Sequence, residues 1–257
     1  MMQRKLLFFI AFIIFCSCSH IQVNPPDNFA YISIKTTDFS LASWQKITDE
    51  TAPVIIYVEG DGNAYSSKGY PTNDPTPKNS LIQQIAFEDK SPNVIYLARP
   101  GQFIEDKNCS QKDWTTGRFS QKIVDNMFEA IKKVSADKKI ILIGYSGGAL
   151  LTGLIINQHK NDLNIIEWVT IAGLFNHTDW TKLFDLLSLK DSLDLETIPD
   201  IKQKHFICKY DEVIPYELTI KRVNKADCII LEATHNDKKI LQQFLEYFNC
   251  IKIQNVL

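Results

Sequence analysis

Short apolar runs separated by polar stretches recur along this 257-residue chain from about residue 30 onward. Near the start, residues 31–34 and 39–41 alternate around a Thr-Thr-Asp turn, the period-two pattern of half-buried antiparallel strands. The later runs lack this alternation and are rich in β-branched residues, as expected of parallel strands covered on both faces. We predict such strands at 54–58, 94–98, 140–143, 165–172 and 228–231, with a more polar one at 205–210.

Helical periodicity lies between several of these runs. Apolar residues recur at the spacing of one buried helical stripe between 119 and 134 and again between 240 and 248, and residues 149–156 have the composition of a fully buried helix. Strands that alternate with helices form right-handed crossovers and a parallel sheet. We therefore predict an α/β fold, with a mostly parallel central sheet, helices on both faces and an N-terminal antiparallel hairpin. Ligands of such folds bind at the carboxyl ends of the strands.

The most specific motif directly follows the strand predicted before the buried helix. It reads Gly144-Tyr145-Ser146-Gly147-Gly148, a G-x-S-x-G sequence between a strand and a helix, which is the setting of a nucleophile elbow. The sharp turn at such a serine requires positions without side chains two residues before and after it, and both are glycine here. A glycine-rich turn that binds phosphate is the alternative, but the lysine of a P-loop is missing.

On this motif the chain resembles the α/β-hydrolases, and the resemblance covers nearly all of residues 30–257. Residues 58–62, Val-Glu-Gly-Asp-Gly, are similar to the family's oxyanion loop, with Glu59 where histidine is common. Three further segments resemble a subgroup of bacterial lipoprotein hydrolases: Ala-Arg-Pro-Gly at 98–101, Trp-Thr-Thr-Gly-Arg-Phe at 114–119 and Asp-Glu-Val-Ile-Pro at 211–215.

The resemblance implies which groups surround the nucleophile. The backbone N–H groups of Gly147 and Asp61 correspond to the oxyanion hole, and Gly60 and Tyr145 lie on the same two loops as candidate substrate contacts. Because a carboxylate would oppose a developing oxyanion, we expect the side chain of Asp61 to point away from it.

The chain has five histidines that are candidates for the catalytic base. His20 precedes the folded domain. His159 lies 13 residues beyond the serine, roughly 20 Å along the elbow helix. His205 begins its predicted strand and so falls at the opposite sheet edge. His235 follows the strand at 228–231, which suits the family order of serine, acid and histidine, and we predict it as the base. His177 is the rival, and we assign it to the lining of the substrate pocket.

Two aspartates follow predicted strands at the same sheet edge as candidates for the acid. Asp211 belongs to a segment, residues 210–215, that matches the family's acid turn, so we predict that it orients His235. Asp179 is the alternative, at the start of a predicted lid over 174–203. The apolar side chains of this lid suit an acyl substrate group, or they pack an amphipathic helix on the sheet.

The N-terminus predicts export. Arg4 and Lys5 precede an apolar run over 6–16 that is short for a membrane span, the alternative, and fits a signal peptide over 1–17. Residues 15–18 resemble a bacterial lipobox, which implies a lipid-modified Cys18 and a tether to residue 29. No aspartate follows Cys18, which by the same resemblance implies sorting to the outer membrane, with the protein facing the periplasm.

Composition narrows the function further. A net charge of −2 without a basic stripe gives no support for a nucleic-acid partner. No CxxC or HxxxH spacing occurs, so we expect neither a metal nor a cofactor. The cysteines at 109, 208, 228 and 250 allow three disulfide pairings, whereas Cys208 and Cys228 also suit buried free thiols.

These observations predict an envelope lipoprotein with a single hydrolase domain over 30–257. Its expected reaction is cleavage of carboxylic esters of small acyl substrates through an acyl-enzyme. A non-catalytic binding module on the same fold, and a peptidase, are the alternatives.

Overall fold

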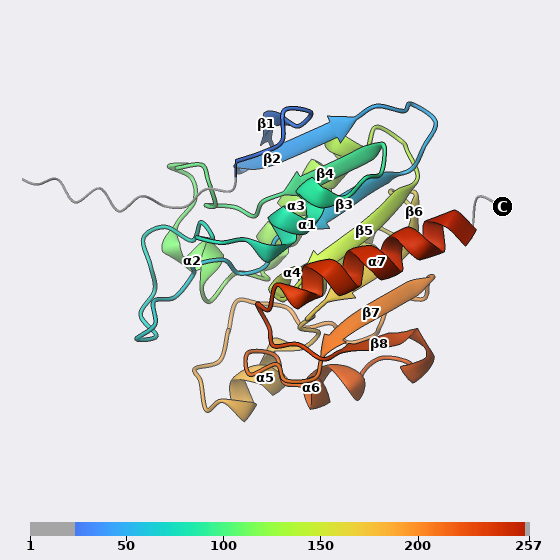
Figure 1. The fold of residues 1–257 in the computed structure, drawn as a ribbon. Coiled ribbons are helices and arrows are strands. Elements are labelled where there is room, and N and C mark those ends of the chain that lie inside the picture. Colours follow the sequence, from blue (N-terminus) through green and yellow to red (C-terminus); the bar gives the residue numbers. More distant parts are fainter. Residues whose placement is uncertain (1–23, 255–257) are drawn as a thin grey trace, which may run out of the picture.

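The computed structural model describes residues 24–254, with side chains described as far as residue 248. The predicted signal peptide and Cys18 lie outside this range. In the described part, one eight-stranded sheet has the order β1-β2-β4-β3-β5-β6-β7-β8 (Figure 1). The first two strands form an antiparallel hairpin, and β2 also pairs antiparallel with β4, while all other neighbours are parallel. The strands are β1 (Ala30–Lys35), β2 (Ser40–Ile47), β3 (Val54–Val58), β4 (Asn93–Leu97), β5 (Ile140–Tyr145), β6 (Ile165–Ile171), β7 (Gln203–Cys208) and β8 (Cys228–Leu231).

Each predicted apolar run forms a strand, and the predicted fold class is confirmed. The second hairpin strand, predicted at 39–41, extends further as β2 and ends at Ile47. The sixth run, predicted at 205–210, is shifted, because β7 begins at Gln203. Gln203 and Lys204 pair through their backbones with Trp168 and Val169 of β6, and this pairing does not require apolar side chains. His205 therefore lies inside the strand rather than at its start.

The hairpin differs from the prediction in its burial. Of the β1 residues only Ile34 is buried, while the side chains of Tyr31 and Ile32 are 52% and 41% exposed. The reason is that β1 forms the edge of the sheet. Period-two alternation therefore located the strand correctly but gave its burial wrongly.

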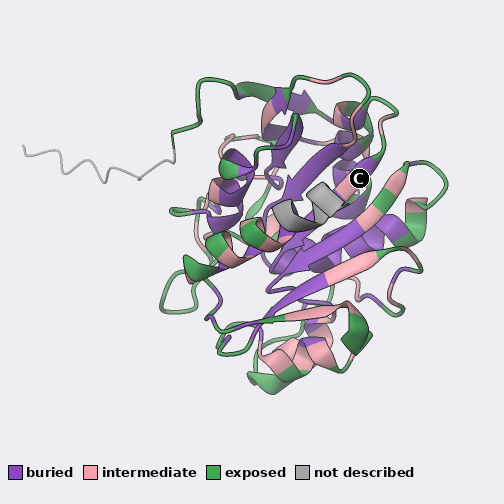
Figure 2. Cartoon of the chain, turned by 45° about the vertical axis from the view of Figure 1, so that its right-hand side comes forward, coloured by how far each residue is buried: buried purple, intermediate pink, exposed green. Residues whose placement is uncertain are grey.

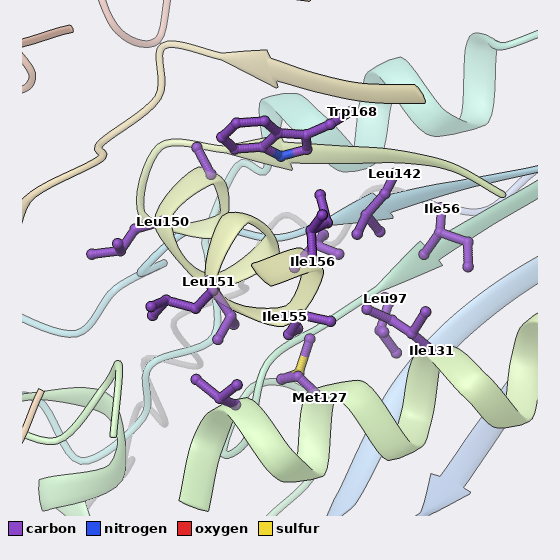
Figure 3. Packing of buried hydrophobic residues seen from close by; sticks show 14 of the residues in the cluster. Ile56, Leu97, Met127, Ile131, Leu142, Leu150, Leu151, Ile155, Ile156 and Trp168 are labelled. Atoms are coloured by element: carbon purple, nitrogen blue, oxygen red, sulfur yellow. The ribbon is translucent and has the colours of Figure 1, made fainter. Parts of the chain in front are cut away.

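Helices cover both faces of the sheet (Figures 1 and 2). On one face α1 (Leu81–Glu88) and α7 (Lys239–Gln254) share a hydrophobic cluster with the strands. On the other face α3 (Gln121–Ser135) and α4 (Gly147–His159) share a second cluster. Figure 3 shows this second cluster, in which Met127 and Ile131 of α3 lie near Leu97 of β4 and Ile155 of α4. The shorter helices are α2 (Gln111–Trp114), α5 (His177–Leu183), α6 (Tyr216–Ile220) and the 3₁₀ turn η1 (Lys225–Asp227).

The parallel strands bring the loops after their carboxyl ends to one edge of the sheet. The loops after β3, β5, β7 and β8 carry Asp61, Ser146, Asp211 and His235 respectively. Within residues 24–254, no helix combines the length and the apolar character that a membrane span needs.

Candidate functional site

Ser146 occupies the sharp turn between β5 and α4. Its backbone has φ 52° and ψ −122°, a conformation that costs a non-glycine residue about 1–3 kcal/mol and persists only where neighbours hold it. Three backbone hydrogen bonds do so. The N–H of Ser146 donates to the carbonyl of Ile171, and its own carbonyl accepts from the N–H groups of Ala149 and Leu174, each at 3.0 Å. The serine hydroxyl takes no part in these bonds and is free for other contacts.

The glycines on either side of Ser146 meet the steric demand predicted for them. A Cβ on Gly144 would lie 2.5 Å from the carbonyl oxygen of Gly148. A Cβ on Gly148 would lie 2.7 Å from the carbonyl oxygens of Val58 and Glu59. Since both distances are far below van der Waals contact, the turn can close on itself only with glycine at 144, and it can pack against the end of β3 only with glycine at 148.

Three predicted site residues form a hydrogen-bonded chain. His235 Nε2 lies 3.0 Å from Ser146 Oγ, and His235 Nδ1 lies 2.7 Å from Asp211 Oδ2. The other carboxylate oxygen, Oδ1, accepts from the N–H groups of Val213 and Ile214 at 2.8 and 2.7 Å. The Asp211 side chain is 1% exposed. With Nδ1–H donating to this carboxylate, Nε2 is left as the acceptor for the serine hydroxyl.

Tyr145 supports the loop that carries His235. Its hydroxyl lies 3.0 Å from the carbonyl oxygen of His235 and 2.6 Å from Oδ1 of Asn236. Burial, followed by the charges of Glu59 and Asp211, raises the pKa of Tyr145 well above its ordinary value. Tyr145 therefore stays protonated and acts as a hydrogen-bond donor to this loop.

Ser146 and His235 line a cavity of about 450 Å³. Of the other predicted site residues, Gly147, Asp61 and Tyr145 line it as well. Gly60 lies behind the serine, where a Cβ would be 3.1 Å from Ser146 Cβ. Five of the predicted residues thus share one hollow, and Gly60 permits the close packing of β3 and the elbow.

His177 is placed differently from the prediction. It begins α5 and is 3% exposed, and its Nε2 lies 3.1 Å from the carbonyl oxygen of Ser192. Its ring stacks on Phe119 at a centroid distance of 6.1 Å. Among the described residues, the lining of the Ser146 cavity does not include it. The assignment of His177 to the pocket lining is therefore wrong, since its side chain faces the loop at 192–194 instead.

The side chain of Asp61 also departs from the prediction, because it does not point away from the elbow. A Cβ on Gly147 would lie 2.2 Å from Asp61 Oδ1, so this oxygen packs directly against Gly147. Two buried arginines hold the carboxylate there: Arg99 Nη1 lies 2.6 Å from Oδ1, and Arg118 Nε lies 2.9 Å from Oδ2. Burial acts to raise the pKa of Asp61, but the charges of Arg118 and Arg99 outweigh it and lower the pKa.

Comparison with known proteins identifies the architecture. No family model matches the chain, and no curated protein does. Among solved structures, mouse α/β hydrolase domain-containing protein 10 aligns with a TM-score of 0.61 at 15% identity, over 89% of this chain and 100% of its own. The chain has the α/β-hydrolase fold.

Two further structures with the α/β-hydrolase fold align over similar lengths. Est1E from Butyrivibrio proteoclasticus has a TM-score of 0.59 at 13% identity, with 88% of this chain and 98% of its own covered. XC6422 from Xanthomonas campestris, described as an α/β serine hydrolase without a lid, has a TM-score of 0.52 at 12% identity, with 87% and 94% covered. At these identities the likeness establishes the fold alone.

Within this α/β-hydrolase fold, the rival acid makes other contacts. Asp179 Oδ2 pairs with Arg222 at 2.8 Å and with Lys221 at 3.2 Å. The hydrogen bond from Arg222, the hydrogen bond from Lys221 and their charges lower the pKa of Asp179. The partner of His235 is Asp211, as predicted, because the Asp211 loop follows the strand next to β8.

The predicted lid contributes little to the cavity. From residues 174–203, Leu174 and Trp180 line it, while Phe175 packs in the core. The Trp180 indole N–H donates to the carbonyl of Val213 at 2.7 Å, which ties α5 to the loop after Asp211. Four other apolar side chains of this segment are exposed: Leu183, Phe184, Leu186 and Leu187. Phe175 thus packs as in the core-packing alternative, and the lid stays a prediction.

Sequence reasoning assigned no role to Glu59, Arg99 or Arg118. Glu59 is buried and accepts hydrogen bonds from the N–H of Gly60 and from the hydroxyls of Ser80 and Tyr96. Burial raises its pKa despite these bonds. The arginines lie in segments singled out only by resemblance. Their position beside apolar residues in the sequence could have indicated that they are buried, and a buried charged group needs a partner.

The described cysteines are free thiols. Cys208 is buried, whereas Cys109 and Cys228 are partly buried. Burial raises the pKa of both Cys109 and Cys208 to about 12. The side chain of Cys250 lies outside the described part. In that part no group of three or more His, Cys, Asp or Glu side chains is arranged to hold a metal ion.

His205 is a buried residue of the sheet. Its Nδ1 lies 2.9 Å from Thr170 Oγ1, and its Nε2 lies 2.9 Å from Gln203 Oε1. The rings of Trp168 and Phe175 contact it edge-on. Burial lowers the pKa of His205 from 6.5 to about 4. A lowered pKa means that the folded protein disfavours the protonated ring.

This lowered pKa predicts a stability loss in mild acid. The unfolded chain protonates this ring near pH 6.5, whereas the folded protein does so only near pH 4. The contribution of neutral His205 to the free energy of unfolding is therefore fully present above pH 6.5 and is lost as the pH falls from 6.5 to 4. At pH 5 we expect protonation of His205 to lower the free energy of unfolding by about 2 kcal/mol relative to pH 7. Urea unfolding at both pH values measures it. His205→Gln should lose less stability on acidification, and an equal loss in parent and variant would contradict this origin.

Proposed function

We propose that this protein is a serine hydrolase that cleaves carboxylic esters of small acyl substrates. The observation that carries the proposal is the chain of contacts from Ser146 Oγ through His235 to Asp211 at the edge of a cavity. In the proposed reaction Ser146 Oγ attacks the ester carbonyl while His235 Nε2 takes its proton. Asp211 keeps the Nδ1–H tautomer and stabilises the imidazolium that forms.

The proposed oxyanion donors are the N–H groups of Gly147 and Asp61. Neither has a hydrogen-bond partner among the described residues, and both residues line the cavity with Ser146. Each donor of this kind is worth about 2.7–4 kcal/mol of barrier. The nearby Asp61 carboxylate would oppose the oxyanion if it were unpaired, but Arg99 and Arg118 neutralise it.

The second half of the reaction follows from the same groups. His235 returns its proton to the departing alkoxide, which leaves as the alcohol, and Ser146 carries the acyl group. A water that gives its proton to His235 Nε2 then attacks the acyl-enzyme, and the serine leaves with that proton as the acid product is released. The protein needs no metal or cofactor for any of these proton transfers.

A fluorophosphonate probe and a panel of esters test the proposal. We expect covalent labelling at Ser146 and turnover of acyl esters of graded chain length, with the optimum length reporting the acyl space. Peptidase activity is tested with the matching amides, which should react far more slowly. A protein that neither takes the probe nor turns over any ester or amide would instead be the non-catalytic binding module.

We also propose that the chain is exported and anchored through Cys18, on the sequence pattern of residues 1–18. Mass spectrometry of the N-terminal peptide from bacterial membranes is expected to show cleavage before Cys18 and a diacylglycerol-sized mass increase on it. Cys18→Ala should abolish this modification and release the protein from the outer-membrane fraction. An unmodified Cys18, or an N-terminus that retains residues 6–16, would contradict the proposal.

A further inference from the structure

Two buried cations share a single carboxylate beside the candidate site. The side chains of Arg99 and Arg118 are 5% and 4% exposed, and both pair with Asp61. The charges of Asp61 and Glu59 both act on Arg99, whereas Asp61 is the one carboxylate paired with Arg118 among the described residues. A buried arginine that shares its paired carboxylate with another cation is stabilised by a further anion, so an anionic ligand beside Arg118 would be stabilised.

The two guanidinium groups are used to different extents. Arg99 Nη1 donates to Asp61 and Arg99 Nη2 donates to the carbonyl oxygen of Arg118 at 2.5 Å, so both terminal nitrogens are engaged. In Arg118, Nε pairs with Asp61, and Nη1 has only a 3.5 Å contact with the carbonyl of Thr115. Its Nη2 has no hydrogen-bond partner among the described residues. Arg118 thus keeps donor capacity, and it lines the cavity that contains Ser146.

Aromatic rings fix the plane of this guanidinium. Arg118 Cζ lies 5.6 Å from the ring centroids of Tyr65 and Phe119 and 5.7 Å from that of Trp180. Rings at these distances favour a cation and limit its rotation. The fork of Arg118 is therefore held in place before any ligand binds, which lowers the entropy cost of binding.

Two more charged side chains, Glu59 and Lys78, also line the cavity. The oxygens of Glu59 accept from Gly60, Ser80 and Tyr96, and its charge acts on Arg99. Lys78 lines the cavity too and adds a further cation. The hollow beside the nucleophile thus presents two cations, Arg118 and Lys78.

We propose that Arg118 binds an anionic group of the substrate, so that the preferred esters carry a carboxylate or a similar anion a few bonds from the scissile carbonyl. This inference rests on the proposed ester hydrolysis at Ser146. A planar guanidinium binds carboxylates through parallel N–H···O bonds, and hydrogen bonds to a charged group are worth enough to change affinity by about tenfold or more. The same cavity then discriminates against neutral esters of equal size.

Two pairs of matched esters test the inference. Monoethyl succinate and its amide, ethyl succinamate, differ only in a charged group on the acyl side. Acetoxyacetate and acetoxyacetamide differ in the same way on the alcohol side. We expect kcat/KM for the carboxylate to exceed that for the amide by about tenfold or more in at least one pair. The pair that shows the preference identifies which side of the ester Arg118 contacts.

Substitutions assign the preference to Arg118. Arg118→Gln is expected to reduce the carboxylate-to-amide ratio by about tenfold, and Arg118→Lys to reduce it less because a cation remains. Lys182→Gln is the matched control, since Lys182 is exposed on α5 and its replacement changes the net charge equally. This control should leave the ratio unchanged.

A second measurement does not depend on turnover of the variant. Succinate is expected to slow fluorophosphonate labelling of the parent protein more than succinamide does, and this difference should be smaller in Arg118→Lys. Equal protection by the two compounds together with equal kcat/KM within both ester pairs would overturn the inference while leaving the hydrolase proposal intact. Absence of both labelling and ester turnover in the parent would overturn the proposed function, and this inference with it.

Discussion

Ser146→Ala is expected to abolish fluorophosphonate labelling and to lower ester turnover by about 10⁶-fold, as removal of the nucleophile does in a well-studied serine triad. Alanine lacks only the Oγ that lies 3.0 Å from His235 Nε2. The turn itself is held by backbone bonds to Ile171, Ala149 and Leu174, which the substitution leaves in place. The melting temperature should therefore stay close to that of the parent.

Intact-mass measurement of the labelled protein and initial rates on the preferred ester check this result. Ser135→Ala is a suitable control, because Ser135 lies at the end of α3 and its hydroxyl contacts only the carbonyl of Lys132. The control should label and turn over like the parent. Labelling of Ser146→Ala at another serine, with turnover retained, would show that the nucleophile lies elsewhere.

Asp211→Asn is expected to lower turnover by about 10⁴-fold, as the corresponding change does in a well-studied triad. Oδ1 of Asp211 accepts from two backbone N–H groups, so in the variant the amide oxygen is expected to take that place. The amide NH₂ then faces His235 Nδ1, which must become an acceptor. The proton moves to Nε2, and the ring can no longer accept the proton of Ser146.

The matched variant Asp179→Asn should cost far less, because Asp179 pairs with Arg222 and Lys221 rather than with His235. Both variants need melting curves, since removing the carboxylate of Asp211, which is 1% exposed, can also destabilise the fold by about 1–3 kcal/mol. The measurement is kcat/KM at a temperature where all three proteins are folded. A crippled Asp179→Asn beside an active Asp211→Asn would contradict the acid assignment.

Local sequence patterns predicted much of the fold. The unbroken β-branched runs reappear as the parallel strands because both faces of the sheet are covered by helices. The elbow was predictable because its demands are local: Gly144 and Gly148 are needed within two residues of Ser146. His235 and Asp211 were predictable from the order of strands, since parallel strands end at a common edge.

The same sequence patterns did not predict the exposure of the edge strand or the presence of a short helix. The exposure of β1 depends on its place at the sheet edge. Helix α1 was not predicted at all, because its eight residues are too few to show a clear period, although Ser80 caps it by accepting from the N–H of Gln83. Such features follow from neighbours in space rather than from neighbours in sequence.

The sequence by itself therefore determined the strands along the chain, the three longest helices, the elbow at Ser146 and the loops that supply Asp211 and His235, because these depend on periodicity and on strand direction. Only the tertiary structure decided where the charged groups around the elbow go. Asp61 meets Arg99 across 38 positions of the chain, and Arg118 reaches the same carboxylate from a third loop. The burial of such charges depends on the joint packing of three segments that no local pattern describes.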